Sequence, residues 1–537
     1  MKAIAVIAVI MLLLGCQSQA PKEQDLLHVK SDSGTKAKKV IMLVVDSLMS
    51  ASIDRGIRAN QLPSFQYLIE HGQYYPGMVS SFPTMSVTID SSLLTGAYPD
   101  QHHVPGLVWY SSEGRKLINY GTGPMEVLRH GVNPVLADAL IHLNSDHLSR
   151  KITTVYEELD RLGYKSGSVN GLIYRGNHDH QLSIPAWIQA AASLPAELSV
   201  KGPPFMSLGV LSNPLKDAKD LPEGVMGRLG LNNEYAIETV KYLVRAKILP
   251  DFLYVYLPDL DQKLHRNGPA DLKGVIKTDQ QLGELLQAFG SPEKALEEAV
   301  MIIMGDSGMT TIHEAERQPV IELSTLLGDL NVMKPGEELS DDTEVIIAVN
   351  ETMAYVYPVS ANLSAEALSR RIAADPRIDF AAWKEREWIH VVQGATGKQL
   401  DYRAGGRLTD TYKQSWQVQN DESVLDLHID KGKLTVAYGQ FPDGLRRLSG
   451  ALHSHSGSYV VVTAKPGYEL ADRSSPTHKG GGGHGAMRRM ESLVPLIISG
   501  TDHKPPQLRI VDMKAYMLDL VTKQQARTLD EGKRGAQ

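Results

Sequence analysis

The chain of 537 residues contains a single cysteine, Cys16. A disulfide needs two cysteines and a thiolate metal site needs several, so the sequence excludes both. Any metal site in this protein must therefore be built from carboxylates, imidazoles and hydroxyls.

Aromatic residues are also scarce, at 6%, and positive charge is not in excess, because the formal net charge is -7. Proteins that bind nucleic acids usually present a basic face, and those that bind single strands stack bases on aromatic rings. We therefore predict no nucleic-acid binding.

Long hydrophobic runs are missing as well. The apolar run Ala3–Leu14 follows Lys2 and is too short to span a bilayer, as is typical of an export signal. It ends in Leu13-Leu14-Gly15-Cys16, which resembles the lipobox of bacterial lipoproteins, where the cysteine carries the lipid. The alternative is a plain signal peptide with an incidental cysteine.

From this pattern we expect a lipoprotein signal peptide over residues 1–16 and a polar tether over residues 17–39. The protein would then be exported and held to the outer face of a bacterial cell membrane by a lipid on Cys16 alone.

Three continuous apolar runs each lead into acidic residues. Val40–Val45 is followed by Asp46, Asp251–Leu257 by Pro258-Asp259, and Ala299–Met304 by Gly305-Asp306. Such runs are typical of strands buried on both faces of a parallel sheet, and ligands bind beyond the carboxyl ends of these strands. The pattern predicts a doubly wound, mostly parallel α/β sheet with a carboxylate-lined rim.

Two further segments carry candidate metal ligands. Asp261 and His265 are four residues apart just after an apolar run, so one helical turn would place both on the same face. His484 follows four glycines, and His453, His455 and His478 are competing candidates nearby. The segment Gly176–His180 also holds histidines, but we expect a solvated loop there.

Ser86 lies where Phe82-Pro83-Thr84 gives way to a segment that favours a helix, Val87–Leu94. A hydroxyl at a helix N-terminus faces the positive end of the helix dipole, which favours a bound phosphate. Serine is also an ordinary helix cap, so a purely structural role stays open.

The middle of the chain has a different sequence pattern from the rest. Between residues 323 and 450 short strand-like runs alternate with polar stretches, which predicts an inserted α+β cap subdomain. We expect a core over residues 40–322 that resumes over residues 451–525, with Ser458–Thr463 returning to the core sheet.

Together these segments resemble the type I phosphodiesterase/nucleotide pyrophosphatase branch of the alkaline phosphatase superfamily. The resemblance covers 40–96, 252–268, 301–309 and 483–500, in the order that the family has. It implies an alkaline-phosphatase-like fold and a hydrolase with two divalent metal ions, usually zinc.

Residue by residue, the resemblance implies Ser86 as the nucleophile, with Thr84 as the alternative. One metal ion, Zn²⁺ by the resemblance, would bind Asp261, His265 and His484. The other would bind Asp46 and Asp306. The family has a histidine directly after this last aspartate, where this chain has Ser307. Because oxygen ligands suit harder ions, the Asp46/Asp306 site could hold Zn²⁺, Mn²⁺ or Mg²⁺, with Ser307 as an additional ligand.

The sequence therefore predicts a metal-dependent phosphodiesterase or phosphatase that acts on a small-molecule phosphoester. Two alternatives stay open: a phosphonate hydrolase or phosphotransferase on the same fold, and a surface-binding lipoprotein with impaired catalysis. A sulfatase is excluded, because Ser86 lacks the following Pro and Arg that the sulfatase nucleophile motif requires.

Overall fold

The computed structural model describes residues 26, 29–31, 37–121, 132–473 and 475–534. Cys16 and the predicted signal peptide lie outside these residues. No helix of the described part is long and apolar enough to cross a membrane.

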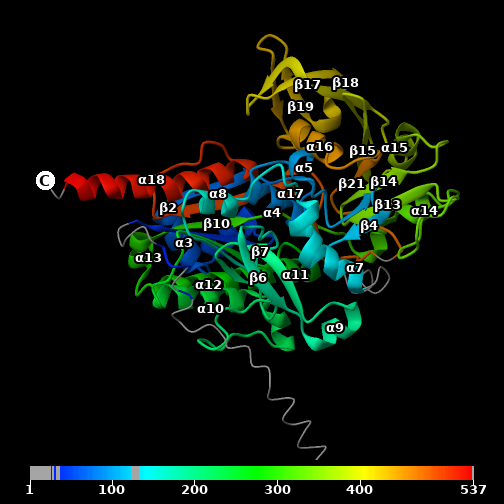
Figure 1. Ribbon diagram of the computed structural model, residues 1–537. Helices are drawn as coiled ribbons and strands as arrows, with labels where there is room; N and C mark the ends of the chain where they lie inside the picture. Colours follow the sequence, from blue (N-terminus) through cyan, green and yellow to red (C-terminus); the bar gives the residue numbers. More distant parts are fainter. Residues whose placement is uncertain (1–25, 27–28, 32–36, 122–131, 474, 535–537) are drawn as a thin grey trace, which may run out of the picture.

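The core of the protein is a seven-stranded sheet (Figure 1). Only one of its strands, β24, is antiparallel to its neighbours; the others all run in one direction. In spatial order the strands are β2 (Gly72–Val79), β24 (Leu493–Ser499), β10 (Ala299–Gly305), β1 (Lys39–Val45), β9 (Phe252–Leu257), β5 (Ser166–Val169) and β8 (Phe205–Ser207). This arrangement confirms the predicted mostly parallel α/β fold.

The apolar sequence of β1 follows from its position at the centre of the sheet, with both faces covered. Val40, Met42 and Val44 pack in the core on one face, together with residues of α4 (Ser86–Thr95), α8 (Val155–Arg161) and α18 (Met513–Arg534). Ile41 and Leu43 pack on the other face against α3 (Pro63–Glu70), α10 (Asn233–Arg245) and α12 (Lys273–Ala288). A strand covered on both faces has no position for a polar residue until it ends.

A second sheet of nine strands lies beside the core, where β17, β18 and β19 project away from the central sheet (Figure 1). Its strands are β13 (Val345–Asn350), β14 (Met353–Pro358), β21 (Val460–Ala464), β15 (Ile378–Glu385), β16 (Trp388–Gln393), β17 (Gln399–Asp410), β18 (Ser415–Asn420), β20 (Thr435–Tyr438) and β19 (Leu427–Asp430). The helices α15 (Ala365–Ala373) and α16 (Gly444–Leu452) belong to the same part of the chain.

Membership of this sheet corrects one expectation. The run Ser458–Thr463 does not return to the core sheet, because β21 pairs with β14 on one side and β15 on the other. An apolar run of this kind fits the middle of either sheet, so its sequence could not decide between them. The limits of the inserted subdomain at residues 323 and 450 stay predictions.

A second expectation is also wrong. The segment from His178 onward forms β6 (His178–Ser183), which pairs with β7 (Glu197–Gly202) in a separate two-stranded sheet. His178 makes an ion-pair contact with Asp160 at 3.0 Å rather than joining a metal cluster. One face of this hairpin, with Asp179, Gln181 and Ser183, is exposed and polar, which explains why the sequence resembles a loop.

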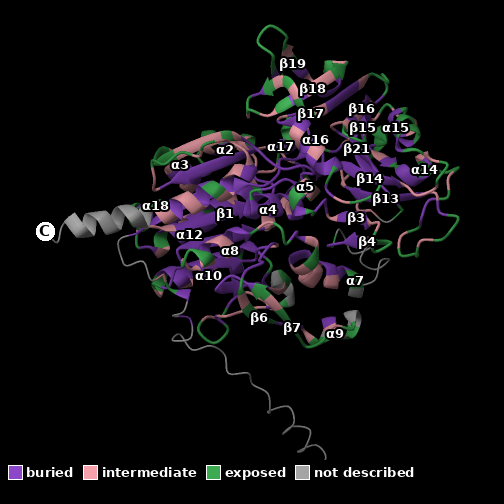
Figure 2. Cartoon of the chain, turned by 45° about the horizontal axis from the view of Figure 1, so that its top comes forward, coloured by how far each residue is buried: buried purple, intermediate pink, exposed green. Residues whose placement is uncertain are grey.

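Arg447 of α16 joins the inserted part to the segment before Ser86. Its side chain is fully buried and donates hydrogen bonds to the carbonyls of Pro442, Met487 and Ser81, the last at 2.7 Å. Residues far apart in sequence therefore meet at one guanidinium. Figure 2 shows that strands of both sheets, such as β1 and β14, are buried.

We predict that Arg447→Met lowers the free energy of unfolding by about 3 kcal/mol or more, because it leaves buried carbonyls without donors. Urea denaturation measures the change. Arg407→Met is the matched control: Arg407 is exposed on β17, and the change there should stay within about 0.5 kcal/mol. An equal loss in both variants would contradict the role given to Arg447.

Candidate active site

The two carboxylates predicted from the ends of parallel strands meet at one edge of the central sheet. Asp46 follows β1 and Asp306 follows β10, which is its parallel neighbour. Both side chains are buried. Asp306 Oδ1 accepts hydrogen bonds from the backbone N–H groups of Ser47, at 2.8 Å, and Ser307, at 2.6 Å.

The other oxygen of Asp306 is unusual. Oδ2 is buried and has no hydrogen-bond partner among the described residues. A buried carboxylate oxygen without a donor is costly, and a metal ion would satisfy it. The donor set of this side therefore fits a divalent cation.

Burial and the neighbouring negative charges disfavour ionisation of these two acids. Burial, and then the charges of Asp306 and Asp261, raise the pKa of Asp46 well above its usual range. Burial is also the main cause of the raised pKa of Asp306. A cation between the two carboxylates would remove this penalty.

Ser86 is the first residue of α4, as the sequence predicts, and its hydroxyl lies 3.3 Å from Asp46 Oδ1. The second oxygen of Asp46 accepts a short hydrogen bond from Tyr256. Thr84 is placed differently: its hydroxyl donates to the carbonyl of Ala486 and accepts from the N–H of Gly485 at 2.8 Å. Thr84 therefore holds the segment after His484, whereas Ser86 is adjacent to the carboxylates.

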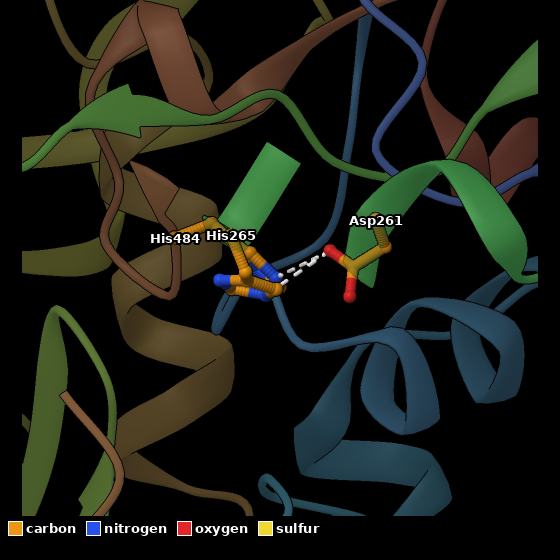
Figure 3. A group of neighbouring side chains, drawn as sticks. All are labelled: Asp261, His265 and His484. Carbon is orange, nitrogen blue, oxygen red and sulfur yellow. Dashed lines mark ion pairs between the residues drawn. The ribbon is translucent and has the colours of Figure 1, made fainter. Parts of the chain in front are cut away.

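The second predicted metal set is also assembled. Asp261 and His265 lie on α11 (Asp259–Asn267), and His484 reaches them from the glycine-rich loop (Figure 3). Asp261 Oδ1 lies 3.1 Å from His265 Nε2 and 3.4 Å from His484 Nε2. Ligand atoms around a tetrahedral zinc ion are about 3.4 Å apart, so these spacings fit one ion.

Both imidazoles are oriented by backbone carbonyls. His265 Nδ1 contacts the carbonyl of Gly482 at 2.8 Å, and His484 Nδ1 contacts that of Thr84 at 2.6 Å. A ring that donates from Nδ1 presents Nε2 as the ligand atom, which is the arrangement seen around bound metals. The glycines explain the close approach: a Cβ on Gly481 would lie 1.9 Å from the carbonyl oxygen of His265.

Without a metal ion this set is an ionic cluster. Burial lowers the pKa of His265, but the charges of Glu351 and Asp261 outweigh it and raise the pKa to about 9. Burial raises the pKa of Asp261, but the two histidines lower it well below its usual range. Metal binding must displace the histidine protons, so metal affinity should fall in acid.

Ser307, which replaces the histidine that the resemblance leads one to expect, points into the same region. Its hydroxyl lies 3.2 Å from that of Ser47, and Ser47 Oγ donates to Asp261 at 2.7 Å. Ser47 thus links the two carboxylate sets. Sequence reasoning missed this role, although the position of Ser47 directly after Asp46 was a signal.

Two more side chains lie in the cluster, of which only Glu351 was not a candidate ligand. Glu351 Oε1 lies 3.6 Å from His265 Nε2, and the His478 ring lies against the His265 ring, tilted by 32°, with centroids 4.3 Å apart. His478 was among the competing histidines. No sequence pattern indicates Glu351, because it lies in the turn between β13 and β14. His453 and His455 lie elsewhere, at the end of α16 and against Tyr459.

Comparisons with known proteins identify the family to which this chain belongs. A family model described as type I phosphodiesterase/nucleotide pyrophosphatase matches residues 40–487. The chain therefore belongs to this family of phosphoester hydrolases. No match was found among curated proteins.

Solved structures share the fold over almost the whole chain. Murine ectonucleotide pyrophosphatase/phosphodiesterase 5, as an inactive variant in complex with AMP, is 13% identical with a TM-score of 0.52, covering 90% of this chain and 95% of that chain. Its human counterpart gives the same values. Phosphonoacetate hydrolase from Sinorhizobium meliloti 1021, in complex with phosphonoacetate, is 14% identical with a TM-score of 0.56, covering 91% and 97%.

The metal-free protein should respond to pH through His265. Because its pKa is raised in the folded state, the stabilisation is fully present below the unfolded value of 6.5 and is lost as pH rises through about 9. The melting temperature in chelator should therefore fall between about pH 6.5 and 9, and the fall should be smaller in His265→Asn. An unchanged slope in that variant would contradict the assignment.

Proposed function

We propose that this chain is a metal-dependent phosphodiesterase that uses Ser86 as its nucleophile. The observation that carries the proposal is the position of Ser86 at the N-terminus of α4, with its hydroxyl on Asp46 and the buried Asp306 close by. Family membership supplies the reaction class, the hydrolysis of phosphoric esters.

The residues fit two divalent ions. Asp261, His265 and His484 offer the nitrogen and oxygen ligands that zinc prefers. Asp46 and Asp306, with Ser86 and Ser307, offer only oxygen, so this side would hold Zn²⁺, Mn²⁺ or Mg²⁺. Such ions would supply positive charge at the phosphoryl oxygens and lower the pKa of the attacking hydroxyl.

The protein's own groups would orient the nucleophile and bind the phosphate. Asp46 accepts the hydrogen bond of Ser86 and so orients its oxygen, while Tyr256 fixes the other oxygen of Asp46. The first turn of α4 places a positive dipole end at the phosphate. Ser86 would attack phosphorus and release one alcohol, which takes the proton of the Ser86 hydroxyl. The serine-linked phosphodiester that forms would then be hydrolysed by water to a phosphomonoester.

The substrate would be a small phosphoester, in keeping with the family description. The AMP and phosphonoacetate bound by the similar structures make a nucleotide diester and a phosphonate the two substrates to compare first. We expect the diester to be preferred, as the family description indicates.

We predict that Ser86→Ala lowers kcat for a chromogenic phosphodiester by at least about 10³-fold, because the variant lacks the attacking oxygen. The assay is run with added Zn²⁺ or Mn²⁺ and with chelator, beside a monoester and phosphonoacetate. Thr88→Ala is the control, since Thr88 is buried two residues further along the same helix.

Chelator-sensitive cleavage that survives in Ser86→Ala would refute the nucleophile. Phosphonate cleavage in preference to both esters would favour the phosphonate hydrolase alternative. Failure of every substrate with every metal would favour a binding lipoprotein.

We also propose that the chain is exported and lipid-anchored through Cys16 at the outer face of a bacterial membrane. Support comes from the apolar run Ala3–Leu14 and the Leu13-Leu14-Gly15-Cys16 motif.

Cys16→Ala should move the protein from the membrane fraction to the soluble fraction of bacterial cells and abolish incorporation of labelled fatty acid. Without a lipid, the segment has no anchor of bilayer-spanning length. Membrane association that persists without label would refute the lipid anchor.

A further inference from the structure

His265 belongs to two groups of side chains with the spacing of metal ligands. In one it joins Asp261 and His484, and in the other it joins Glu351 and His478. In each group the ligand atoms all lie within 4.8 Å of one another. Each group offers two imidazoles and one carboxylate, so both have the donor chemistry of a zinc site.

The histidine that is specific to the second group, His478, is also oriented by hydrogen bonds. His478 Nδ1 lies 3.1 Å from Glu469 Oε2, and the backbone N–H of His478 donates to both oxygens of the same carboxylate. Glu469, on β22 (Glu469–Ala471), is fully buried. A carboxylate on Nδ1 leaves Nε2 of His478 as the ligand atom, in the manner of histidines that bind metals.

Glu351 is fixed as well, next to both groups. Its Oε2 accepts the backbone N–H of His484 at 3.1 Å, while Oε1 is 3.6 Å from His265 Nε2. The Glu351 carboxyl group therefore faces the histidines.

The two groups cannot both be filled. Each needs His265 Nε2, because His265 Nδ1 is occupied by the carbonyl of Gly482. One neutral imidazole nitrogen binds one ion. Occupation of either group therefore empties the other.

We propose that His265, Glu351 and His478 form a second zinc-type site that alternates with the site of Asp261, His265 and His484. Asp261 ties the first site to Ser47 and the central sheet. Glu351 and His478 tie the second to the turn of the inserted sheet and to buried Glu469. A single ion thus has two positions, of which only the first is joined through Ser47 to Ser307 beside Asp306.

This inference deepens the proposed function, because it concerns the same centre, but its test counts bound metal and needs no substrate. Zinc content and affinity are measured on the full chain in metal-buffered solution. Every protein carries Asp306→Asn, which weakens the separate Asp46/Asp306 site. The variants added to it are Asp261→Asn, His478→Asn and the two together.

The expected result is one zinc ion per chain in the parent and in both single variants. Zinc affinity should fall by at least about 100-fold only in the double variant, because each site has then lost a direct ligand, which costs more than the loss of an outer partner. Co²⁺ bound to the protein adds a second readout, since its visible absorption bands should differ between Asp261→Asn and His478→Asn.

Three results would overturn the proposal. Loss of zinc in Asp261→Asn alone, with His478→Asn unaffected, would leave only the first site. Loss of zinc in His478→Asn alone would leave only the second site. Two zinc ions per chain in the parent would show that the sites do not exclude each other.

Glu351→Gln together with Asp261→Asn repeats the test without disturbing Glu469, in case His478→Asn does not fold. Circular dichroism in chelator shows which variants fold. If zinc alternates as proposed but no phosphodiester is cleaved, the proposed function fails and this inference stands.

Discussion

The burial of carboxylates at one edge of the central sheet is the constraint on which the candidate active site depends. Asp46 and Asp306 lie at the ends of adjacent parallel strands with their side chains out of water, and Asp261 adds a third negative charge. Parallel strands deliver their carboxyl ends to one edge, so the fold concentrates the acids that a cation would neutralise. Backbone N–H groups satisfy one oxygen of Asp306, and the other has no hydrogen-bond partner among the described residues.

Much of this centre can be predicted from the sequence, because its parts follow strands. Asp46 and Asp306 are placed by the apolar runs before them, and the spacing of Asp261 and His265 already implies one helical face. Ser86 is recognisable because Pro83 precedes a segment that favours a helix. In each case a local rule of chain geometry fixes the side chain relative to its own element, and the sheet brings the elements together.

The remaining parts depend on contacts between distant segments. Glu351 lies in a hairpin turn whose sequence carries no ligand pattern, and it meets His265 only because the inserted sheet lies against the core. His484 could be separated from His478 by family resemblance, yet both rings lie against His265. Strand β21 was assigned to the wrong sheet because its apolar residues fit either one.

Strand β21 also limits how the inserted sheet can be exchanged. It lies between β14 and β15, although about 75 residues separate it from β15 in the chain and it follows α16. A transplant of residues 323–450 into a related protein would therefore carry a sheet with its middle strand missing. Any recombination that respects the fold must move the strand 460–464 as well, and the chain runs from there directly into β22 and the glycine-rich loop of His484. The inserted sheet and the metal ligand His484 would therefore be transferred together.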